Sequence, residues 1–391
     1  MKHLKAIFRT ISLSLLTLIS IPATAQPTDA AATDSLEISL ITCSPHEEVY
    51  SLYGHSALRV HDLRTGKDAV FNWGVFNFKA PHFVSRFVFG LTDYELGVGD
   101  FQAFCAYYKR WGSSVTEQVL NLTETEKQQV MAALADNLRP ENRIYRYNYF
   151  YDNCSTRPRD IIEHNLNGRI QYTERQDYTP TYREMVHECV GHHRWAMMGN
   201  DLLLGLRADL KTTRAEQEFL PVNLLYDFDH AQIHATDGSY RPLVKERRMP
   251  VMPGVQTRTP DFPLTPLQCT LCLLAVSLVI ALAEWKQRKV FKLWDLLLML
   301  VSGLAGCVLF VMLFSQHPCT TLNLQLLVFN PLPLFYLYPV ARGRKTRWWY
   351  IQPLLIGLFF LGALIQDYAE GMEIVALCLL IRNVMNLKYA K

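Results

Sequence analysis

A histidine and a cysteine in two short motifs, about a hundred residues apart, have the residue types needed for nucleophilic catalysis. His55 stands in residues 53–56 (Tyr-Gly-His-Ser), just before a strand-like stretch, and Cys154 stands in residues 151–156 (Tyr-Asp-Asn-Cys-Ser-Thr). A thiolate beside an imidazole can attack a carbonyl carbon while the imidazole moves the proton. We therefore predict that the two motifs meet in one site for acyl chemistry.

Cys154 is expected at the beginning of a helix. Asp152 and Asn153, directly before it, are both good helix N-caps. The partial positive charge at a helix N-terminus lowers the pKa of a thiol, and the free amides there can stabilise an oxyanion. These features favour a nucleophile; the alternative is a buried structural thiol or a disulfide partner.

His55 is the predicted base because it begins an alternating strand after a Tyr-Gly turn that would expose it. Asn72, in residues 71–74 (Phe-Asn-Trp-Gly), lies on the next predicted strand and is the candidate for orienting the imidazole. Asp68 and His61 compete with Asn72 for this third role. The alternative for His55 is a core histidine bonded to a backbone carbonyl.

The elements around these motifs predict an α+β domain. Thr123 and Glu126 form a capping box that opens a helix running to Pro140, and a helix from about Ser155 is expected to stop at Gly168. Residues 181–225 are expected to be helical and either to cover the site or to rest on the membrane. Alternating patterns predict strands at residues 35–42, from 57, from 69, at 114–122 and at 144–150.

The last third of the chain is strongly apolar and predicts a membrane domain. Its loops at residues 285–292 and 342–347 are basic, whereas those at 315–321 and 366–373 contain no Lys or Arg. By the positive-inside rule, the domain before the first span lies outside the cytoplasm. Five runs approach the length that crosses a hydrocarbon core of about 30 Å: 267–284, 293–314, 322–341, 351–366 and 370–387.

The first residues have the pattern of a cleavable secretory signal. A basic start is followed by an apolar run at residues 11–21 and by Ala23-Thr24-Ala25. Four segments are thus predicted: a signal peptide at 1–25, a catalytic domain at 26–235, an irregular, proline-rich linker at 236–266 and a five-helix membrane domain at 267–391. The signal peptide and the loop charges agree on an exported catalytic domain.

Charge and cysteine content restrict the function further. A net charge of +3, largely accounted for by the basic membrane loops, argues against binding to nucleic acid. Cys43, Cys105, Cys154 and Cys189 lie in the exported domain, so if Cys154 is the nucleophile, at most one disulfide forms among the other three, with the pairing open.

A rival cluster at residues 187–193 contains His187, Cys189, His192 and His193, residue types that bind zinc. This cluster lacks a carboxylate base or a remote fourth ligand at recognisable spacing. We therefore expect neither a metal nor another cofactor.

The order His, polar residue, Cys resembles circularly permuted papain-like enzymes, including the lecithin retinol acyltransferase group. The whole layout resembles more closely the Lnb-type lipoprotein N-acyltransferases, in which a periplasmic domain precedes five transmembrane helices. The resemblance covers nearly the full chain through five short motifs: residues 53–56, 71–74, 151–157, 219–221 and 317–331. It implies a permuted papain-like cysteine-enzyme domain followed by an all-α transmembrane domain.

The resemblance also implies a two-step reaction at a bacterial inner membrane. Cys154 would take an acyl chain from a phospholipid as a thioester and pass it to the amino group of a diacylglyceryl-cysteine lipoprotein. The motifs supply Tyr53, Asn153 and Arg157 as candidate substrate-binding residues.

In the membrane half, Asn323 and Asn330 are seven residues apart, hence expected on one helical face near the external end of the third span. They are predicted to bind a lipid head group or to hydrogen-bond between helices. Two other functions stay open: a cell-wall peptidase or amidase on the same scaffold, and a non-catalytic receptor. The number of membrane spans favours a substrate that itself lies in the bilayer.

Overall fold

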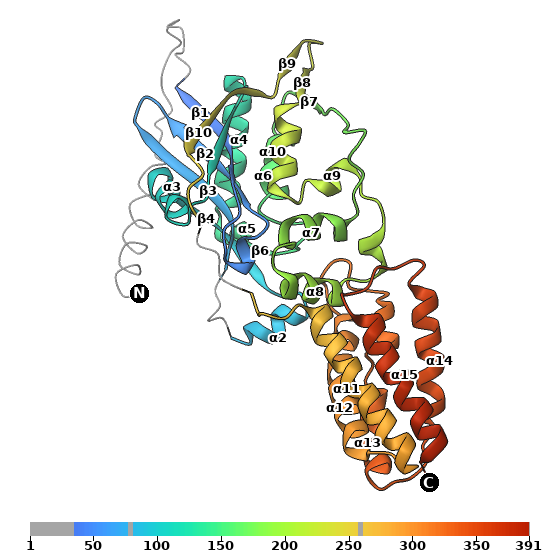
Figure 1. The fold of residues 1–391 in the computed structure, drawn as a ribbon. Coiled ribbons are helices and arrows are strands. Elements are labelled where there is room, and N and C mark those ends of the chain that lie inside the picture. Colours follow the sequence, from blue (N-terminus) through green and yellow to red (C-terminus); the bar gives the residue numbers. More distant parts are fainter. Residues whose placement is uncertain (1–34, 77–80, 257–260, 391) are drawn as a thin grey trace, which may run out of the picture. The chain divides into compact units, whose positions relative to one another are not determined.

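The computed structural model describes residues 35–76, 81–256 and 261–390 (Figure 1). The predicted signal peptide at residues 1–25 lies outside this range. Apart from Ser35, the described residues belong to one compact unit, Leu36–Lys391. This unit contains an α/β part, followed by a helical part.

Seven strands, some adjacent in the chain and others far apart in it, form an antiparallel sheet in the order β10-β5-β1-β2-β3-β4-β6 (Figure 1). The central strands β1, β2 and β3 are consecutive in the chain, and the alternating patterns predicted them together with β5 and β6. The bounds are β1 Leu36–Cys43, β2 His55–Asp62, β3 Lys67–Val75, β4 Asp93–Asp100, β5 Val115–Leu120, β6 Ile144–Arg146 and β10 Val244–Val251.

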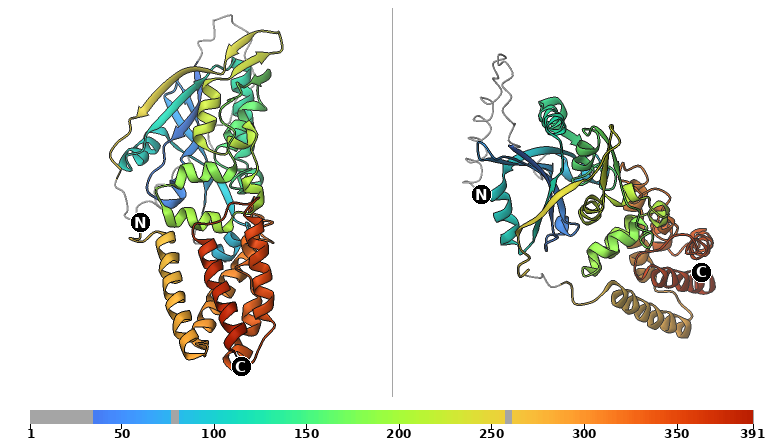
Figure 2. Two further views of the ribbon diagram at one scale, coloured as in Figure 1. Left: turned by 45° about the vertical axis from the view of Figure 1, so that its right-hand side comes forward. Right: turned by 90° about the horizontal axis from the view of Figure 1, so that it is seen from above.

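Both faces of the sheet are covered, because successive side chains of a strand point to opposite faces. Ile38 and Leu40 of β1 face one core cluster, whereas Ile41 and Cys43 face another. Helices α4, α6 and α10 pack on the first face, and α3 packs on the second (Figures 1 and 2). Their bounds are α3 Phe101–Arg110, α4 Glu124–Asn137, α6 Thr156–Glu163 and α10 Pro221–Asp229.

The expected long helical region at residues 181–225 is divided into short helices. These are α7 Tyr182–Val190, α8 Arg194–Leu203, the 3-10 helix η2 Leu206–Asp209, α9 Arg214–Gln217 and the start of α10. Thr181 with Glu184, and Thr213 with Glu216, form capping boxes at two of these starts. Because a capping box begins a new helix, the repeated boxes explain why the segment forms several short helices and not one long helix.

The prediction of an irregular linker at residues 236–266 is wrong for its first half. Residues Val244–Val251 form β10, which pairs with β5 at the edge of the main sheet (Figure 2). A smaller sheet contains β7 Gly168–Gln171, β8 Gln232–Ala235 and β9 Tyr240–Pro242. The sequence of β10 does not alternate between apolar and polar residues, because it is rich in charged side chains. These side chains form ion pairs in the folded chain: Arg248 pairs with Glu37 and Arg247 with Asp229.

The helical part contains α11 Pro266–Gln287, α12 Lys292–Met312, the 3-10 helix η3 Leu324–Leu327, α13 Leu332–Ala341, α14 Trp348–Gly362 and α15 Met372–Tyr389. Of the helical segments that the structure describes, three are long and apolar enough to cross a membrane: 266–287, 292–312 and 324–341, the last of which consists of η3 and α13. Helix α14 is apolar but shorter. On α15, Arg382 is buried against Glu284 of α11 and Asp295 of α12, so an ionic cluster joins three of these helices.

Candidate active site

The site is built on two adjacent strands of the sheet. His55 is the first residue of β2, and Asn72 lies near the end of β3, with which β2 pairs. The Nε2 atom of His55 is 2.6 Å from Oδ1 of Asn72. Because an amide oxygen only accepts hydrogen bonds, Nε2 carries the proton, and Nδ1 is the nitrogen available to a thiol.

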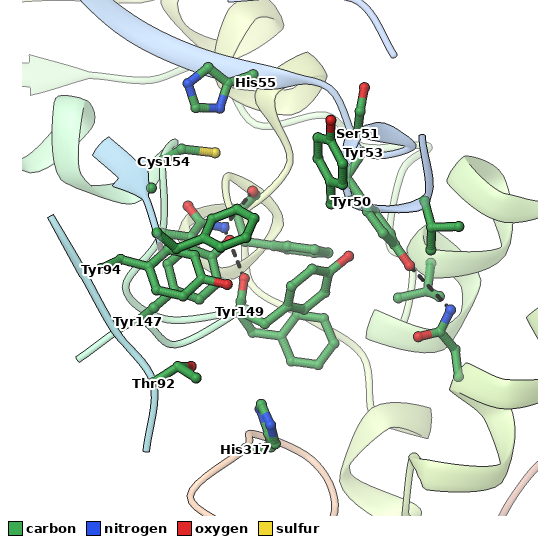
Figure 3. Close-up of a pocket in the computed structure, with 18 of the residues that line it drawn as sticks. Tyr50, Ser51, Tyr53, His55, Thr92, Tyr94, Tyr147, Tyr149, Cys154 and His317 are labelled. Atoms are coloured by element: carbon green, nitrogen blue, oxygen red, sulfur yellow. Dashed lines mark hydrogen bonds between the residues drawn. The ribbon is translucent and has the colours of Figure 1, made fainter. Parts of the chain in front are cut away.

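Cys154 stands against this imidazole from the start of α6 (Figure 3). The loop before it is closed by two backbone hydrogen bonds between Asn148 and Asp152. Asn153 then caps the helix, since its Oδ1 accepts from the backbone N–H groups of Ser155 at 2.7 Å and Thr156 at 3.0 Å. The cap holds the thiol where the sequence predicted it, at the start of the helix.

Gly74 stands beside the point where the Cys154 and His55 side chains meet, and its backbone conformation is what favours glycine there. It has a φ of +102°, and a Cβ on it would lie 4.0 Å from both Cys154 Cβ and His55 Cε1. Such a positive φ suits glycine. The pairing of β3 with β4 also shifts register between Asn72 and Val75, which is a bulge that sets the direction of Asn72.

The electrostatics of the pair favour a thiolate and an imidazolium. Burial raises the pKa of the Cys154 thiol. This rise is outweighed by the charge of His55, by its hydrogen bond and by the backbone N–H groups of Ser56 and Cys154, so the pKa lies below its ordinary value. Burial likewise lowers the pKa of His55, yet Cys154 and the bond to Asn72 raise it above the ordinary value. Each group thus stabilises the charged form of the other.

A cavity of about 630 Å³ opens onto Cys154, His55 and Asn72. Its walls are mostly aromatic and aliphatic (Figure 3), and they include Val308 and Met312 of α12. The aromatic residues of the walls include Tyr50, Tyr53, Tyr94, Tyr107, Tyr108, Tyr147, Tyr149, Phe76, Phe87, Phe150 and Phe219. An apolar cavity that ends at a nucleophile suits a substrate with a large apolar group.

Tyr53 and Asn153, two of the candidate substrate-binding residues, do lie at this cavity. The Tyr53 hydroxyl accepts from Asn200 of α8 at 3.3 Å, and burial raises the pKa of Tyr53 to about 12. Asn153 is buried, and its Nδ2 donates to the carbonyls of Tyr149 and Phe219, both at 2.9 Å. All the polar atoms of the Asn153 side chain are therefore used to hold the chain in place.

The other three candidates do not line the cavity. Arg157 forms a bidentate ion pair with Asp152, at 2.6 and 2.7 Å, and lies over the ring of Tyr145. The expectation that Asn323 and Asn330 share one helical face is wrong, because a turn separates them: Asn323 caps η3, and Asn330 bonds to the backbone of Leu332 at the start of α13. A Pro at 331 and at 333 prevents one continuous helix here.

Of the three candidates for the third role, only Asn72 contacts His55. Asp68 is paired with Arg59 at 2.7 Å, and Nδ1 of His61 lies 3.4 Å from the same guanidinium. Arg59 also pairs with Glu117. These residues form a charged network farther along the same strands.

Sequence reasoning missed the wall of the cavity. Tyr145, Tyr147 and Tyr149 recur at every second position, a pattern that places them on one side of an extended chain, and the last two line the cavity. That alternation was the available signal. His317 and Thr92 lie farther from Cys154 in Figure 3; His317 begins the motif at residues 317–331, whereas Thr92 had no local signal.

The histidine-rich segment 187–193 has a structural explanation. His187 Nε2 lies 2.8 Å from Asp201, which is also paired with the buried Arg183. Among the described residues, no group of three or more His, Cys, Asp or Glu side chains is arranged to hold a metal ion. The nine cysteines all lie in the described part, and none of them is in a disulfide there.

The fold and the site define a membrane protein whose α/β domain carries a Cys-His pair at an apolar cavity. Two family models match the chain: the Lnb N-terminal periplasmic domain over residues 23–188 and the Lnb transmembrane domain over residues 257–391. Together they cover most of the chain in this order, so the chain belongs to the Lnb family, which confirms the resemblance seen in the sequence. No curated protein and no solved structure matches the chain.

Proposed function

We propose that this protein is a lipoprotein N-acyltransferase of the bacterial inner membrane, with its catalytic domain in the periplasm. The observation that carries the proposal is the position of the Cys154-His55 pair at the end of an apolar cavity whose wall continues onto helix α12. A nucleophile placed there can reach substrates that keep their acyl chains in an apolar environment. The family match and the apolar helices support the membrane location.

In the first step, the thiolate of Cys154 attacks the carbonyl carbon of a phospholipid acyl ester. A C–S bond forms, the ester C–O bond breaks, and the glyceryl oxygen leaves with the proton held by His55, giving a lysophospholipid. The backbone N–H groups of Ser56 and Cys154 interact with the sulfur, and they are the donors that we assign to the developing oxyanion.

In the second step, the neutral amino group of a diacylglyceryl-cysteine lipoprotein attacks the thioester. A C–N bond forms and the C–S bond breaks, while the amine proton moves to His55 and the sulfur leaves as a thiolate. The aromatic walls exclude water, which would otherwise hydrolyse the thioester. Asn72 keeps the imidazole in the tautomer that both steps require.

A cell-wall peptidase or amidase would use the same Cys-His pair, but its substrate is polar. The cavity at Cys154 is lined mostly by aromatic and aliphatic side chains. Glycan and peptide groups would lose hydrogen bonds to water there without finding replacements. The lining therefore favours the transferase.

The test is mass spectrometry of the N-terminal lipopeptide of a lipoprotein from cells that lack this protein. The cells are complemented with the wild type, with Cys154→Ser or with Cys189→Ser. Cys189 is the matched control, because it is a half-buried thiol of the same domain that does not line the cavity. We expect a third acyl chain with the wild type and Cys189→Ser only; identical lipopeptides in all strains would overturn the proposal.

A further inference from the structure

We propose that the donor acyl chain reaches Cys154 sideways from the bilayer, through an opening between helix α2 (Phe83–Val88) and the outer end of α12. This inference rests on the proposed function and adds the route of its lipid substrate. It comes from the cavity residues that lie far along the chain from the catalytic pair. These residues are Phe87, Val88, Val308, Met312, His317 and Pro318.

The opening is recognisable because two side chains face both the cavity and the outside. Val308 lines the cavity and is 54% exposed, and Phe87 lines it and is 49% exposed. Met312, one turn farther along α12, lines the same space but is buried. The cavity therefore continues past Met312 and reaches the surface beside Val308.

The surface beside Val308 is one that lipid would cover. Val308 lies within α12, Lys292–Met312, which is long and apolar enough to cross a membrane. It stands four residues before the end of this helix, which is about 6 Å along the axis. The opening thus lies just inside the hydrocarbon boundary, at the depth of the first carbons of an acyl chain.

Both walls of the opening are held in place by hydrogen bonds between α2 and the loop after α12. Ser315 Oγ donates to the carbonyl of Val88 at 2.8 Å, and the N–H of Gln316 donates to the carbonyl of Phe89 at 2.9 Å. His317 Nε2 donates to the carbonyl of Phe87 at 2.6 Å. The wall that holds the lipid thus comes from both halves of the chain.

The energetics of the transfer require an apolar route. Each CH₂ group that moves from hydrocarbon into water costs about 0.8 kcal/mol, so a long chain cannot cross an aqueous gap to Cys154. Moving the same chain into an apolar cavity costs far less, since both environments are apolar. The aromatic residues of the cavity provide such an environment, and Tyr147 and Tyr149 lie between Cys154 and His317 in Figure 3.

The test narrows the opening with Val308→Trp. The full-length protein is placed in vesicles of dipalmitoyl phosphatidylethanolamine and phosphatidylglycerol, and the mass of palmitoylated Cys154 is followed over time. In parallel, p-nitrophenyl acetate, a small soluble ester, measures the reactivity of the same thiol. Val301→Trp is the matched control, because Val301 lies two turns away on the same face of α12, is 56% exposed and does not line the cavity.

We expect Val308→Trp to slow palmitoylation at least tenfold without changing acetylation, and Val301→Trp to change neither. Palmitoylation of Val308→Trp at the wild-type rate would overturn the lateral opening while leaving the proposed function intact. If the wild type is acetylated but never palmitoylated, the proposed function fails, and the opening with it. If Val308→Trp loses both reactions, Val308→Phe, a smaller enlargement, is compared in the same way.

Discussion

The two ring nitrogens of His55 have different partners, and this division of roles determines the chemistry of the site. Nε2 is fixed by Asn72 at 2.6 Å, and the rest of the ring faces the half-buried thiol of Cys154. Without the imidazole the thiol would keep its proton, because partial burial penalises the thiolate. The nucleophile therefore depends on its neighbour more than on its own position.

The pH dependence of thiol alkylation tests this dependence. Because the pKa of Cys154 is lowered by His55, the rate of reaction with iodoacetamide in the wild type should rise with pH through a midpoint below that of an ordinary thiol. In His55→Ala the burial stays but the opposite charge is gone, so the midpoint should move above the ordinary value. At pH 7 the rate should fall more than tenfold, since one pKa unit changes the thiolate fraction about tenfold.

Peptide mass spectrometry measures how much iodoacetamide label Cys154 takes up in the wild type and in His55→Ala, with Cys154→Ser as the blank. Cys189, whose pKa burial raises to about 12, serves as an internal thiol that should behave alike in both proteins. An unchanged midpoint in His55→Ala would show that the histidine does not activate Cys154.

Removal of the Asn72 amide should impair proton transfer without removing the base. In Asn72→Ala the imidazole can rotate away from Cys154, so we expect kcat/KM for acyl transfer to fall by about 10²-fold, the lower part of the range for general acid-base catalysis. Asn72→Asp also accepts a hydrogen bond from Nε2 and should retain most of the activity. Its negative charge raises the pKa of His55, which shifts the basic limb of the pH profile upward.

Full activity in Asn72→Ala would exclude Asn72 from the positioning role. Full loss in Asn72→Asp, with the fold intact, would point instead to a requirement for a neutral partner.

At the scale of elements, helix α6 begins at the catalytic loop, and one side chain connects the two. Asn153 bonds to two backbone N–H groups at the helix start and to two carbonyls from separate segments, those of Tyr149 and Phe219. Removal of the Asn153 side chain would thus leave four backbone groups without this hydrogen-bond partner. The position of Cys154 is fixed by its neighbour in the chain.

We expect Asn153→Ala to lower the free energy of unfolding by about 2–4 kcal/mol, because it removes a cap and leaves buried polar groups unpaired. Acyl transfer should be lost even at temperatures where the protein stays folded, since Cys154 is no longer held against His55. Asn165→Ala, at the other end of the helix, removes one bond to the carbonyl of Ile161 and should cost under about 1 kcal/mol.

Thermal unfolding in detergent, followed by circular dichroism, measures both variants. Equal stability of Asn153→Ala and Asn165→Ala would contradict the role of Asn153 as the central support of the loop.

The central elements were predictable because their signals are local. Alternation gave β1, β2 and β3, and the Asp-Asn pair gave the start of α6. The alternating patterns did not predict β4, whose Gly-rich stretch Glu95–Gly99 has few apolar side chains, or the edge strand β10, whose Arg and Glu side chains form ion pairs. Strands of this kind form because a neighbouring strand is present, which no local pattern shows.

The same distinction applies to the site. His55, Asn72 and Cys154 were found because each lies at the end of a predictable element. The cavity could not be found in this way, since its walls come from segments as far apart in the chain as Tyr50 and Thr320. Only the folded chain brings these segments together.

At the scale of the whole described unit, buried polar contacts join the C-terminal end of α8 to the membrane half. Gln325 Nε2 donates to the carbonyl of Asp201 at 2.8 Å, and Asn323 Nδ2 donates to the carbonyl of Leu202 at 2.8 Å. Gln366 Nε2 donates to the carbonyl of Leu204 at 3.2 Å. Three amide side chains of the membrane half thus donate hydrogen bonds to three neighbouring backbone carbonyls of the periplasmic half. These hydrogen bonds explain why polar side chains are buried at this junction.

Gly205 lies at this junction, packed closely against the loop at Cys319 and Thr321. Its N–H donates to the carbonyl of Cys319 at 2.7 Å, and a Cβ on it would lie 2.1 Å from the carbonyl oxygen of Thr321. Gly199, in α8, has open space around its Cβ position. The two glycines therefore offer a matched pair of substitutions six residues apart.

Gly205→Ala should push the loop at Cys319 and Thr321 away and weaken the junction, at a cost of about 1–3 kcal/mol, as for overpacking in a core. Because that loop carries the cavity residues Pro318 and Thr320, palmitoylation of Cys154 from phospholipid vesicles should slow at least tenfold. Alkylation of Cys154 by iodoacetamide should change little, since His55 and Asn72 belong to the sheet. Gly199→Ala should keep wild-type palmitoylation and gain about 0.5–1 kcal/mol from the better helix former. If Gly205→Ala palmitoylates Cys154 as fast as Gly199→Ala, the junction does not shape the lipid site, and the two halves of the chain work independently.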